Sequence, residues 1–285
     1  MPRIAYVNGR YLPLRDAKVG VEDRGYQFSD GVYEVCEVRD GHLIDLNPHL
    51  DRLERSLSEL RIGWPVARRV LPGLMREVVR RNGVRHGLVY VQATRGEAPR
   101  DHVFPSAAKP ALVITAKSTS LDAGEAKRDK GVAVITVPEN RWERVDIKTV
   151  SLLPNVLARQ RAKEAGAAEA WFVGKDGTVH EGAATNAWIV KDGTIRTRHA
   201  EHGILRGITR ATVMRVAEQL QLKVVEDGFT VDEAKAADEA FMTAASTVVM
   251  PVVAIDGTAV GEGTPGPVTR RLREAFHDVA ERTAA

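Results

Sequence analysis

The sequence predicts two α+β domains, on three observations. The chain has 285 residues, which is long for one ordinary domain and comfortable for two. With 44% hydrophobic and 28% charged residues, it can bury substantial cores and does not have the composition of a disordered protein. Its segments are ordered as strands, helices, strands and helices. Because regular β–α alternation is missing, a doubly wound parallel sheet is not expected.

The chain begins with two expected β-hairpins. Asn8-Gly9 and Asp40-Gly41 each stand between alternating apolar residues, a strong signal for a two-residue turn. Further along, residues 87–96 and 110–117 have the β-rich composition of strands. These segments predict a sheet in the first half of the chain.

Two helices are expected among those strands. Asn47-Pro48 is a helix-start signal, and leucines then repeat at helical spacing, with Arg52 off the apolar stripe. A second helix is expected over residues 67–81, ending at Asn82-Gly83. Residues 117–131 are polar without a sustained period, which predicts a linker. The expected division is a first domain at 1–120, a linker at 121–130 and a second domain at 131–285.

The second half repeats the mixture of strands and helices. A strand is expected at 132–139, and a helix near 153–164. Lys-Asp-Gly-Thr occurs twice between β-rich runs, at 175–178 and 191–194, and predicts a meander with two tight turns. Residues 207–221 and 269–282 are expected to be the last two helices.

Composition excludes several functional classes. The net charge of +3 comes from 41 basic and 38 acidic residues, and the basic stretch 76–87 is interrupted by Val and Glu, which favours a solvated helix face over a nucleic-acid site. No apolar run approaches the roughly 18 residues of a membrane span, and no secretory signal is expected. The single cysteine, Cys36, suits a reducing cytoplasm.

Known sequence signatures exclude further site types. The eight histidines show no metal-ligand spacing, so no metal site is expected. The chain contains no P-loop and no nucleophile elbow.

Lys148 is the first candidate for chemistry. It stands between Ile147 and Thr149 in an apolar, β-branched run where a strand is expected to end. Desolvation would favour a neutral amine, which can attack a carbonyl and form a Schiff base. The stretch alone also fits a lysine whose stem packs on apolar surface while its head reaches water.

Three further stretches carry polar groups that could bind a ligand. Glu181 lies in a Gly/Ala-rich turn with Asn186 five residues on, and could hold a cation or a protonated ring nitrogen. It could also be an ordinary loop acid. Gly207, Ile208 and Thr209 precede a helix, whose free N–H groups would suit phosphate or form a simple cap. Ser246 and Thr247 could close such a cradle.

Arg100 and His102 stand two residues apart in a Pro-bounded segment. In an extended chain their side chains share one face. A guanidinium beside an imidazole suits a carboxylate. The alternative is an exposed charged loop.

Taken in order, these stretches resemble the class IV (fold type IV) pyridoxal-phosphate aminotransferases, and within that class the D-amino-acid (D-alanine) aminotransferases. The resemblance covers about residues 3 to 276. The stretches around Tyr33 and Arg100 are its specific parts, whereas those around Lys148 and Glu181 are shared by the whole class. The stretches are EDRGYQFSDGVYEV, NPHLDRL, TRGEAPRDHVFP, VDIKTVSLLPNVLA, HEGAATNAW, ILRGITR and TAAST.

The resemblance implies a two-domain fold with pyridoxal 5′-phosphate at the domain interface, and a cytoplasmic homodimer. Lys148 would be the Schiff-base lysine and the proton carrier, and Glu181 would pair with the pyridine nitrogen. Arg52 would bind the phosphate and Leu205 would pack on the ring. The phosphate cup would be completed at Gly207, Ile208 and Thr209, with Ser246 and Thr247.

The implied reaction is ping-pong transamination through pyridoxamine phosphate, from a D-amino acid to a 2-oxo acid such as 2-oxoglutarate. Tyr33, Arg100 and His102 would hold the substrate's α-carboxylate. Alternatives within the class are a branched-chain or (R)-amine transaminase and an aminodeoxychorismate lyase. A non-enzymatic binding module of the same fold is a further alternative.

This chain departs from the family's pattern at two positions. Ala245 stands where relatives carry the hydroxyl assigned to phosphate, so Ser246 or backbone N–H groups are expected to replace it. Asp101 lies between Arg100 and His102 and is expected to pair with Arg100 or to reshape substrate preference.

Overall fold

The computed structural model describes residues 3–201 and 203–284. Contacts divide the chain into two compact units, each with one sheet and its own helices, so the predicted α+β class is confirmed. Unit 1 takes the chain up to Ser120, Ile147–Ser151 and the residues from Glu281 on. Unit 2 takes Leu121–Asp146 and Leu152–Ala280. The sequence division placed all of 131–285 in one domain, whereas the contacts group the Lys148 segment with unit 1.

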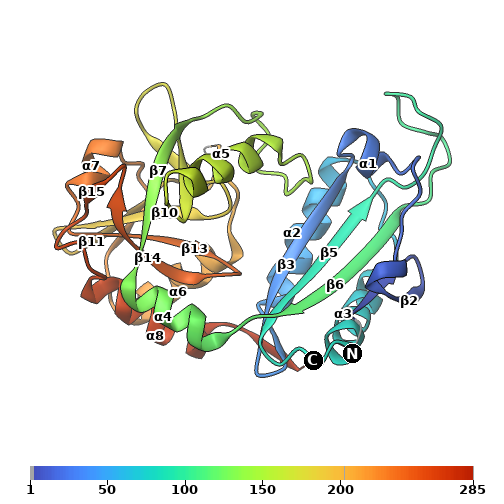
Figure 1. The fold of residues 1–285 in the computed structure, drawn as a ribbon, viewed down its shortest axis with the longest axis horizontal. Coiled ribbons are helices and arrows are strands. Elements are labelled where there is room, and N and C mark those ends of the chain that lie inside the picture. The colour runs from blue at the N-terminus through green and yellow to red at the C-terminus, as the bar shows by residue number, and fades with distance from the viewer. Residues whose placement is uncertain (1–2, 202, 285) are drawn as a thin grey trace. The chain divides into compact units, whose positions relative to one another are not determined.

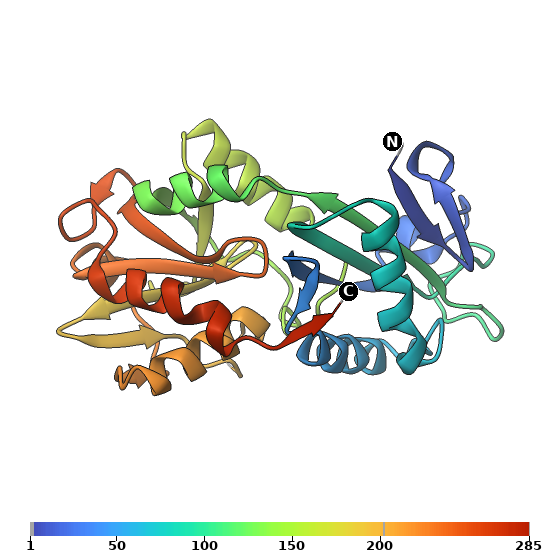
Figure 2. The same ribbon diagram turned by 90° about the horizontal axis from the view of Figure 1, so that it is seen from below.

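Unit 1 is built on a seven-stranded antiparallel sheet, in the order β16-β4-β3-β5-β6-β1-β2. The C-terminal strand lies beside β4 at one edge (Figure 2). Both expected hairpins are present, with the positive φ angles that the two-residue turns require: 46° at Asn8 and 51° at Asp40. The strands are β1 (Ile4–Val7), β2 (Arg10–Pro13), β3 (Gly31–Arg39), β4 (His42–Ile44), β5 (Gly87–Thr94), β6 (Ala111–Ser118) and β16 (Arg282–Ala284).

Helices α2 (Leu46–Glu59) and α3 (Leu71–Arg81) pack against this sheet, and the short α1 (Arg24–Phe28) precedes β3 (Figure 1). The α2 helix begins at Leu46, before the predicted Pro48. Its N-cap is Asp45, in left-handed conformation, and the Asp45 carboxylate accepts a bond from the N–H of Glu281 instead of capping the helix.

The expected helix over residues 67–81 is in two pieces. A 3-10 turn at Arg68–Val70 precedes α3, which has Pro72 in its first turn. Proline is favoured in the first helical turn because the N–H that it lacks would have no partner within the helix there. A second 3-10 turn, Leu14–Asp16, follows β2.

Unit 2 contains a nine-stranded mixed sheet with the path β12-β11-β10-β13-β14-β7-β8-β9 and β15 beside β14. Pairs β7–β8, β7–β14 and β11–β12 are parallel, and the others are antiparallel. The strands are β7 (Val132–Pro138), β8 (Glu169–Val173), β9 (Val179–Gly182), β10 (Asn186–Lys191), β11 (Thr194–Thr197), β12 (Val224–Val225), β13 (Glu239–Ala244), β14 (Val248–Ile255) and β15 (Thr258–Ala259).

The helices of unit 2 are α4 (Leu121–Lys130), α5 (Leu153–Glu164), α6 (Ile208–Gln219), α7 (Val231–Lys235) and α8 (Pro267–Val279). The predicted linker is helix α4. Its residues are mostly polar and form no apolar stripe, so periodicity could not reveal it. The Arg128–Glu125 pair at 2.7 Å supports it locally. Helix α6 packs against α8 and β13.

Neither a membrane-spanning helix nor a cluster of metal ligands is found in the described part of the chain. No helix in it is both long and apolar enough to cross a bilayer. Within the same residues, no three His, Cys, Asp or Glu side chains are grouped as metal ligands.

Candidate active site

The Lys148 segment is bound to β3 by its backbone. Tyr33 N–H donates to the Lys148 carbonyl at 3.0 Å, and Val150 N–H donates to Gly31 at 3.1 Å. Thr149 forms an isolated β-bridge with Val32. The strand that was expected to end here is therefore absent, and this single bridge lies in an irregular segment. The Lys148 side chain is half-buried, and its Nζ lies 4.4 Å from the centroid of the Tyr33 ring. An amine is therefore held over an aromatic face.

Tyr33 is itself fixed by its neighbour on β5. Its ring stacks on Tyr90 at 5.5 Å, and the Tyr90 hydroxyl donates to Gln92 at 2.7 Å. Burial, together with the adjacent Tyr33, raises the pKa of Tyr90 to about 12, so the Tyr90 hydroxyl stays neutral near pH 7. The ring beneath Lys148 has a defined position.

Arg52 belongs to a buried ionic cluster with Glu34 and His49. Glu34 lies on the face of β3 that carries Val32, Cys36 and Val38, so its carboxylate needs partners there. Arg52 Nε and Nη2 donate to it at 2.7 and 2.8 Å, and His49 Nδ1 lies 2.7 Å away. Burial would raise the pKa of Glu34, but Arg52 and His49 hold it well below its usual range.

The loop with Arg100 and His102 is exposed, and both side chains lie around Phe28. The Arg100 guanidinium is 4.6 Å from the Phe28 centroid, and the His102 ring is 5.3 Å from it. The Asp101 carboxylate accepts a bond from Val103 N–H at 3.3 Å. The expected pairing with Arg100 is not among the contacts of the described residues.

A buried arginine anchors this loop. Arg24 donates to the Asp101 carbonyl at 2.5 Å and to the His102 carbonyl at 3.5 Å. Its Nε donates to Asp30, which also accepts a hydrogen bond from Arg95 Nε. Burial would raise the pKa of Asp30, yet the two guanidinium groups lower it. The loop is therefore held to an ionised ion pair.

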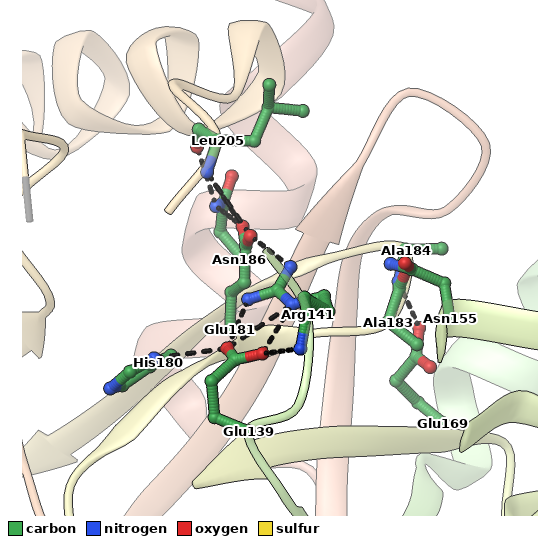
Figure 3. A network of polar contacts seen from close by, with 10 residues as sticks. All are labelled: Glu139, Arg141, Asn155, Glu169, His180, Glu181, Ala183, Ala184, Asn186 and Leu205. Atoms are coloured by element: carbon green, nitrogen blue, oxygen red, sulfur yellow. Dashed lines mark hydrogen bonds and ion pairs between the residues drawn. The ribbon is translucent and has the colours of Figure 1, made fainter. Parts of the chain in front are cut away.

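Glu181 in unit 2 is surrounded by donors (Figure 3). Asn186 Nδ2 donates to one carboxylate oxygen at 3.0 Å, Leu205 N–H donates at 3.1 and 3.2 Å, and Arg141 Nη1 donates at 2.7 Å. The Asn186 amide also donates to the Leu205 carbonyl at 3.1 Å. These bonds fix the direction of a carboxylate that is 4% exposed.

The start of α6 lies next to this carboxylate. Its first N–H groups have no partner within the helix, and the N-cap, Gly207, offers no side chain. A Cβ at Gly207 would meet Asn186 Oδ1 at 2.0 Å, so only glycine fits beside that amide. Thr209 is buried in the first turn. Helix α6 thus presents an uncapped N-terminus suited to an anion.

The turn between β13 and β14 supplies another hydroxyl. Ser246 is exposed, whereas the Thr247 Oγ1 atom is buried and, among the described residues, has no hydrogen-bond partner. Val248 follows with φ at 57°, a strained conformation for a buried β-branched residue. Strained turns of this kind are frequent at ligand sites.

These observations fit the predicted cofactor. Unit 2 offers an oriented carboxylate for a ring nitrogen, an uncapped helix start for phosphate and an unpaired buried hydroxyl. Unit 1 offers an amine over an aromatic ring and a buried arginine. Lys148 and Arg52 thus belong to unit 1, whereas Glu181, Gly207 and Thr247 belong to unit 2.

Sequence reasoning missed Glu34, His49, Arg24, Glu139, Arg141 and His180. One signal was available: Glu34 is a carboxylate in the apolar face of an alternating strand, and His49 and Arg52 stand three apart on the following helix. The others depend on contacts between distant parts of the chain, which no local pattern reveals.

Comparison with known proteins agrees with this geometry. Residues 31–255 match the family "Amino-transferase class IV". A D-alanine aminotransferase of Staphylococcus haemolyticus is 40% identical over 277 residues, 97% of each chain. One of Bacillus licheniformis is 39% identical over 271 residues, 95% of each chain.

Solved structures give the same family. The branched-chain amino acid aminotransferase of Escherichia coli superposes with a TM-score of 0.90 at 25% identity, covering 98% of this chain and 95% of its own. A branched-chain amino acid aminotransferase of T.th., solved with pyridoxamine 5′-phosphate, has a TM-score of 0.89 at 31% identity, with coverage of 98% and 94%.

Proposed function

Because this chain belongs to the class IV aminotransferases, we propose that it is a pyridoxal-phosphate-dependent transaminase acting on D-amino acids such as D-alanine. The amino group passes to a 2-oxo acid such as 2-oxoglutarate. The observation that carries this proposal is the near-complete match, at about 40% identity, to D-alanine aminotransferases. The branched-chain structures reported above are 25% and 31% identical.

Pyridoxal phosphate, when bound, supplies an aldehyde that condenses with amines and a ring that accepts electron density. Lys148 is the residue proposed to hold the aldehyde carbon as a Schiff base and to move the proton at the substrate's α-carbon. Its place over Tyr33 supports this role, because a packed stem and a fixed backbone limit where Nζ can reach.

Glu181 is proposed to face the ring nitrogen and keep its proton in place. The donors from Asn186, Leu205 and Arg141 support this role, because their N–H groups all donate to the carboxylate and point it in one direction. Leu205, whose N–H orients this carboxylate, is proposed to pack its side chain on the ring.

Arg52 is proposed to neutralise the phosphate, and the start of α6 at Gly207, Ile208 and Thr209 to donate N–H groups to it. The unpaired Thr247 hydroxyl supports a bond from that turn, in place of the hydroxyl missing at Ala245, and the exposed Ser246 is proposed to assist.

Tyr33, Arg100 and His102 are proposed to hold the substrate's α-carboxylate. The guanidinium of Arg100 is exposed and stacks on Phe28, so its N–H edge can donate two hydrogen bonds to a carboxylate. Because the Asp101 carboxylate bonds to Val103 N–H, it does not occupy that edge.

The direct test is an activity assay. Purified protein with pyridoxal phosphate, D-alanine and 2-oxoglutarate is expected to form pyruvate, and Lys148→Ala is expected to form none above background. Absence of pyruvate together with turnover of L-leucine would assign a branched-chain activity and reject the proposal.

A second candidate is favoured by the structures with TM-scores of 0.90 and 0.89, which are branched-chain enzymes. The same assay with L-leucine or an (R)-amine as donor separates these transaminases. An aminodeoxychorismate lyase would release pyruvate from its substrate without any oxo-acid acceptor.

A homodimer in the cytoplasm is proposed as the working form. One face of α5 exposes Leu153, Val156 and Leu157, between 56% and 69%, at the spacing of a packing stripe, which supports a partner there. The lone cysteine, Cys36, is buried and unpaired, as suits a reducing compartment. Sedimentation equilibrium is expected to give twice the chain mass.

A further inference from the structure

Arg141 lies between two carboxylates in unit 2 (Figure 3). Its Nε and Nη2 donate to Glu139 at 2.9 and 2.6 Å, and its Nη1 donates to Glu181 at 2.7 Å. The guanidinium also stacks over Phe172, 4.3 Å from the ring centroid. Two N–H edges and one face of a planar group are therefore engaged, so its position is fixed.

This cluster is shielded from water. The side chains of Arg141 and Glu181 are 6% and 5% exposed, and that of Glu139 is 17% exposed. His180 Nδ1 lies 3.1 Å from Glu139 Oε2, the oxygen that also accepts from Arg141 Nη2. Burial would raise the pKa of Glu139, but His180 and Arg141 lower it to about 2, so it is ionised near pH 7. Charges interact strongly at such sites.

The charged groups of the cluster are two carboxylates and one guanidinium, with the His180 imidazole at its edge. Figure 3 also shows the buried Glu169, which bonds instead to the N–H groups of Ala170 and Ala184 and to Arg159. The positive charge of Arg141 makes the electrostatic potential around Glu181 less negative, and the negative charge of Glu139 makes it more negative. The two side chains thus act on Glu181 with opposite sign.

We propose that Arg141 and Glu139 are positioning residues that set the charge felt at Glu181. Arg141 orients the carboxylate, and Glu139 compensates the guanidinium, so that Glu181 keeps the negative potential a protonated ring nitrogen needs. This inference rests on the proposed function, since it concerns the group that faces Glu181. Neither residue touches the reacting atoms.

The test is the pH titration of the visible absorption band of the cofactor-loaded protein. Arg141→Gln removes a positive charge, so the pH midpoint is expected to rise by about one unit. Glu139→Gln removes a negative charge, so the midpoint is expected to fall by a similar amount. Damage to the fold alone would not produce shifts of opposite sign.

A second readout is the affinity of the apoprotein for the cofactor. Binding of pyridoxal phosphate to the apoprotein, followed by tryptophan fluorescence, is expected to weaken about tenfold or more in Arg141→Gln, because a charge-assisted hydrogen bond to Glu181 is lost. Arg196→Gln is the matched control. It breaks an ion pair of unit 2 with Glu233 that shares no partner with the cluster, and it is expected to leave both readouts unchanged.

Midpoints that move in the same direction, or that stay at the wild-type value, overturn the inference. If Arg141→Gln fails to fold, the sign in Glu139→Gln decides: a fall supports the inference, and a rise or no change overturns it. A wild-type protein that binds no pyridoxal phosphate and shows no visible band overturns the proposed function, and the inference with it.

Discussion

Glu34 and Arg52 form a bidentate ion pair inside unit 1, with Nε and Nη2 of the guanidinium 2.7 and 2.8 Å from the two carboxylate oxygens. The arginine proposed to bind phosphate, on helix α2, is thus held by a carboxylate of strand β3, against which that helix packs. His49 completes the pair at 2.7 Å from Glu34. The position of the arginine proposed to bind phosphate therefore depends on a buried carboxylate.

Glu34→Gln is expected to weaken the binding of pyridoxal phosphate and to destabilise the protein. The buried guanidinium loses its counter-charge, which costs about 3–5 kcal/mol when a buried pair is broken. Urea unfolding of the apoprotein and cofactor titration measure the two effects. Glu77→Gln, at an exposed cluster with Arg80 and Arg81, is the control, and its loss of stability is expected to be much smaller because exposed ion pairs contribute little. Equal losses in both variants would contradict this account of Arg52.

The same carboxylate makes stability depend on acid pH. The pKa of Glu34 is lowered in the folded state, so its contribution is present above the unfolded value of about 4.3 and is lost as pH falls toward the folded value. Between pH 5 and about 3, wild type is expected to lose more unfolding free energy than Glu34→Gln. Parallel pH profiles for the two proteins, measured in urea, would exclude this linkage.

Gly207→Ala is expected to reduce cofactor affinity about tenfold. The added Cβ would lie 2.0 Å from Asn186 Oδ1 and displace the amide that donates to Glu181, so a hydrogen bond to a charged group is lost. Gly73→Ala is the control, because its Cβ meets nothing within 4 Å and its helix favours alanine. Unchanged affinity in Gly207→Ala would show that Asn186 does not orient the carboxylate.

Arg24→Met is expected to raise KM for D-alanine about tenfold or more with a smaller change in kcat. The variant keeps an apolar stem but loses the donors to the Asp101 and His102 carbonyls that hold the loop with Arg100. Steady-state kinetics measure the split. Arg85→Met, at a highly exposed position, is the control. A fall in kcat alone would mean that the loop does not bind substrate.

Local chemistry predicted much of the fold. The turns at Asn8-Gly9 and Asp40-Gly41 follow from residues that tolerate positive φ, and α5 has its predicted bounds with Pro154 in its first turn. Helix α4 escaped prediction because it has no apolar stripe. The attachment of the Lys148 segment to β3 joins residues more than 100 positions apart, and no period or cap encodes such a contact.

The candidate site divides in the same way. Lys148, Glu181 and the start of α6 stand in short motifs that a sequence displays. The groups that orient them, such as Arg141 on Glu181 and Glu34 on Arg52, become visible only when strands and helices are packed together. The candidate residues could therefore be named from the sequence, whereas the side chains that orient them could not.

The most direct test of the D-amino-acid assignment is a single half-reaction followed by absorbance. The protein loaded with pyridoxal phosphate is mixed with D-alanine or with L-alanine, without any acceptor. D-Alanine is expected to abolish the visible band with release of one pyruvate per site, and L-alanine is expected to leave the band in place. Loss of the band with L-alanine and not with D-alanine would contradict the account.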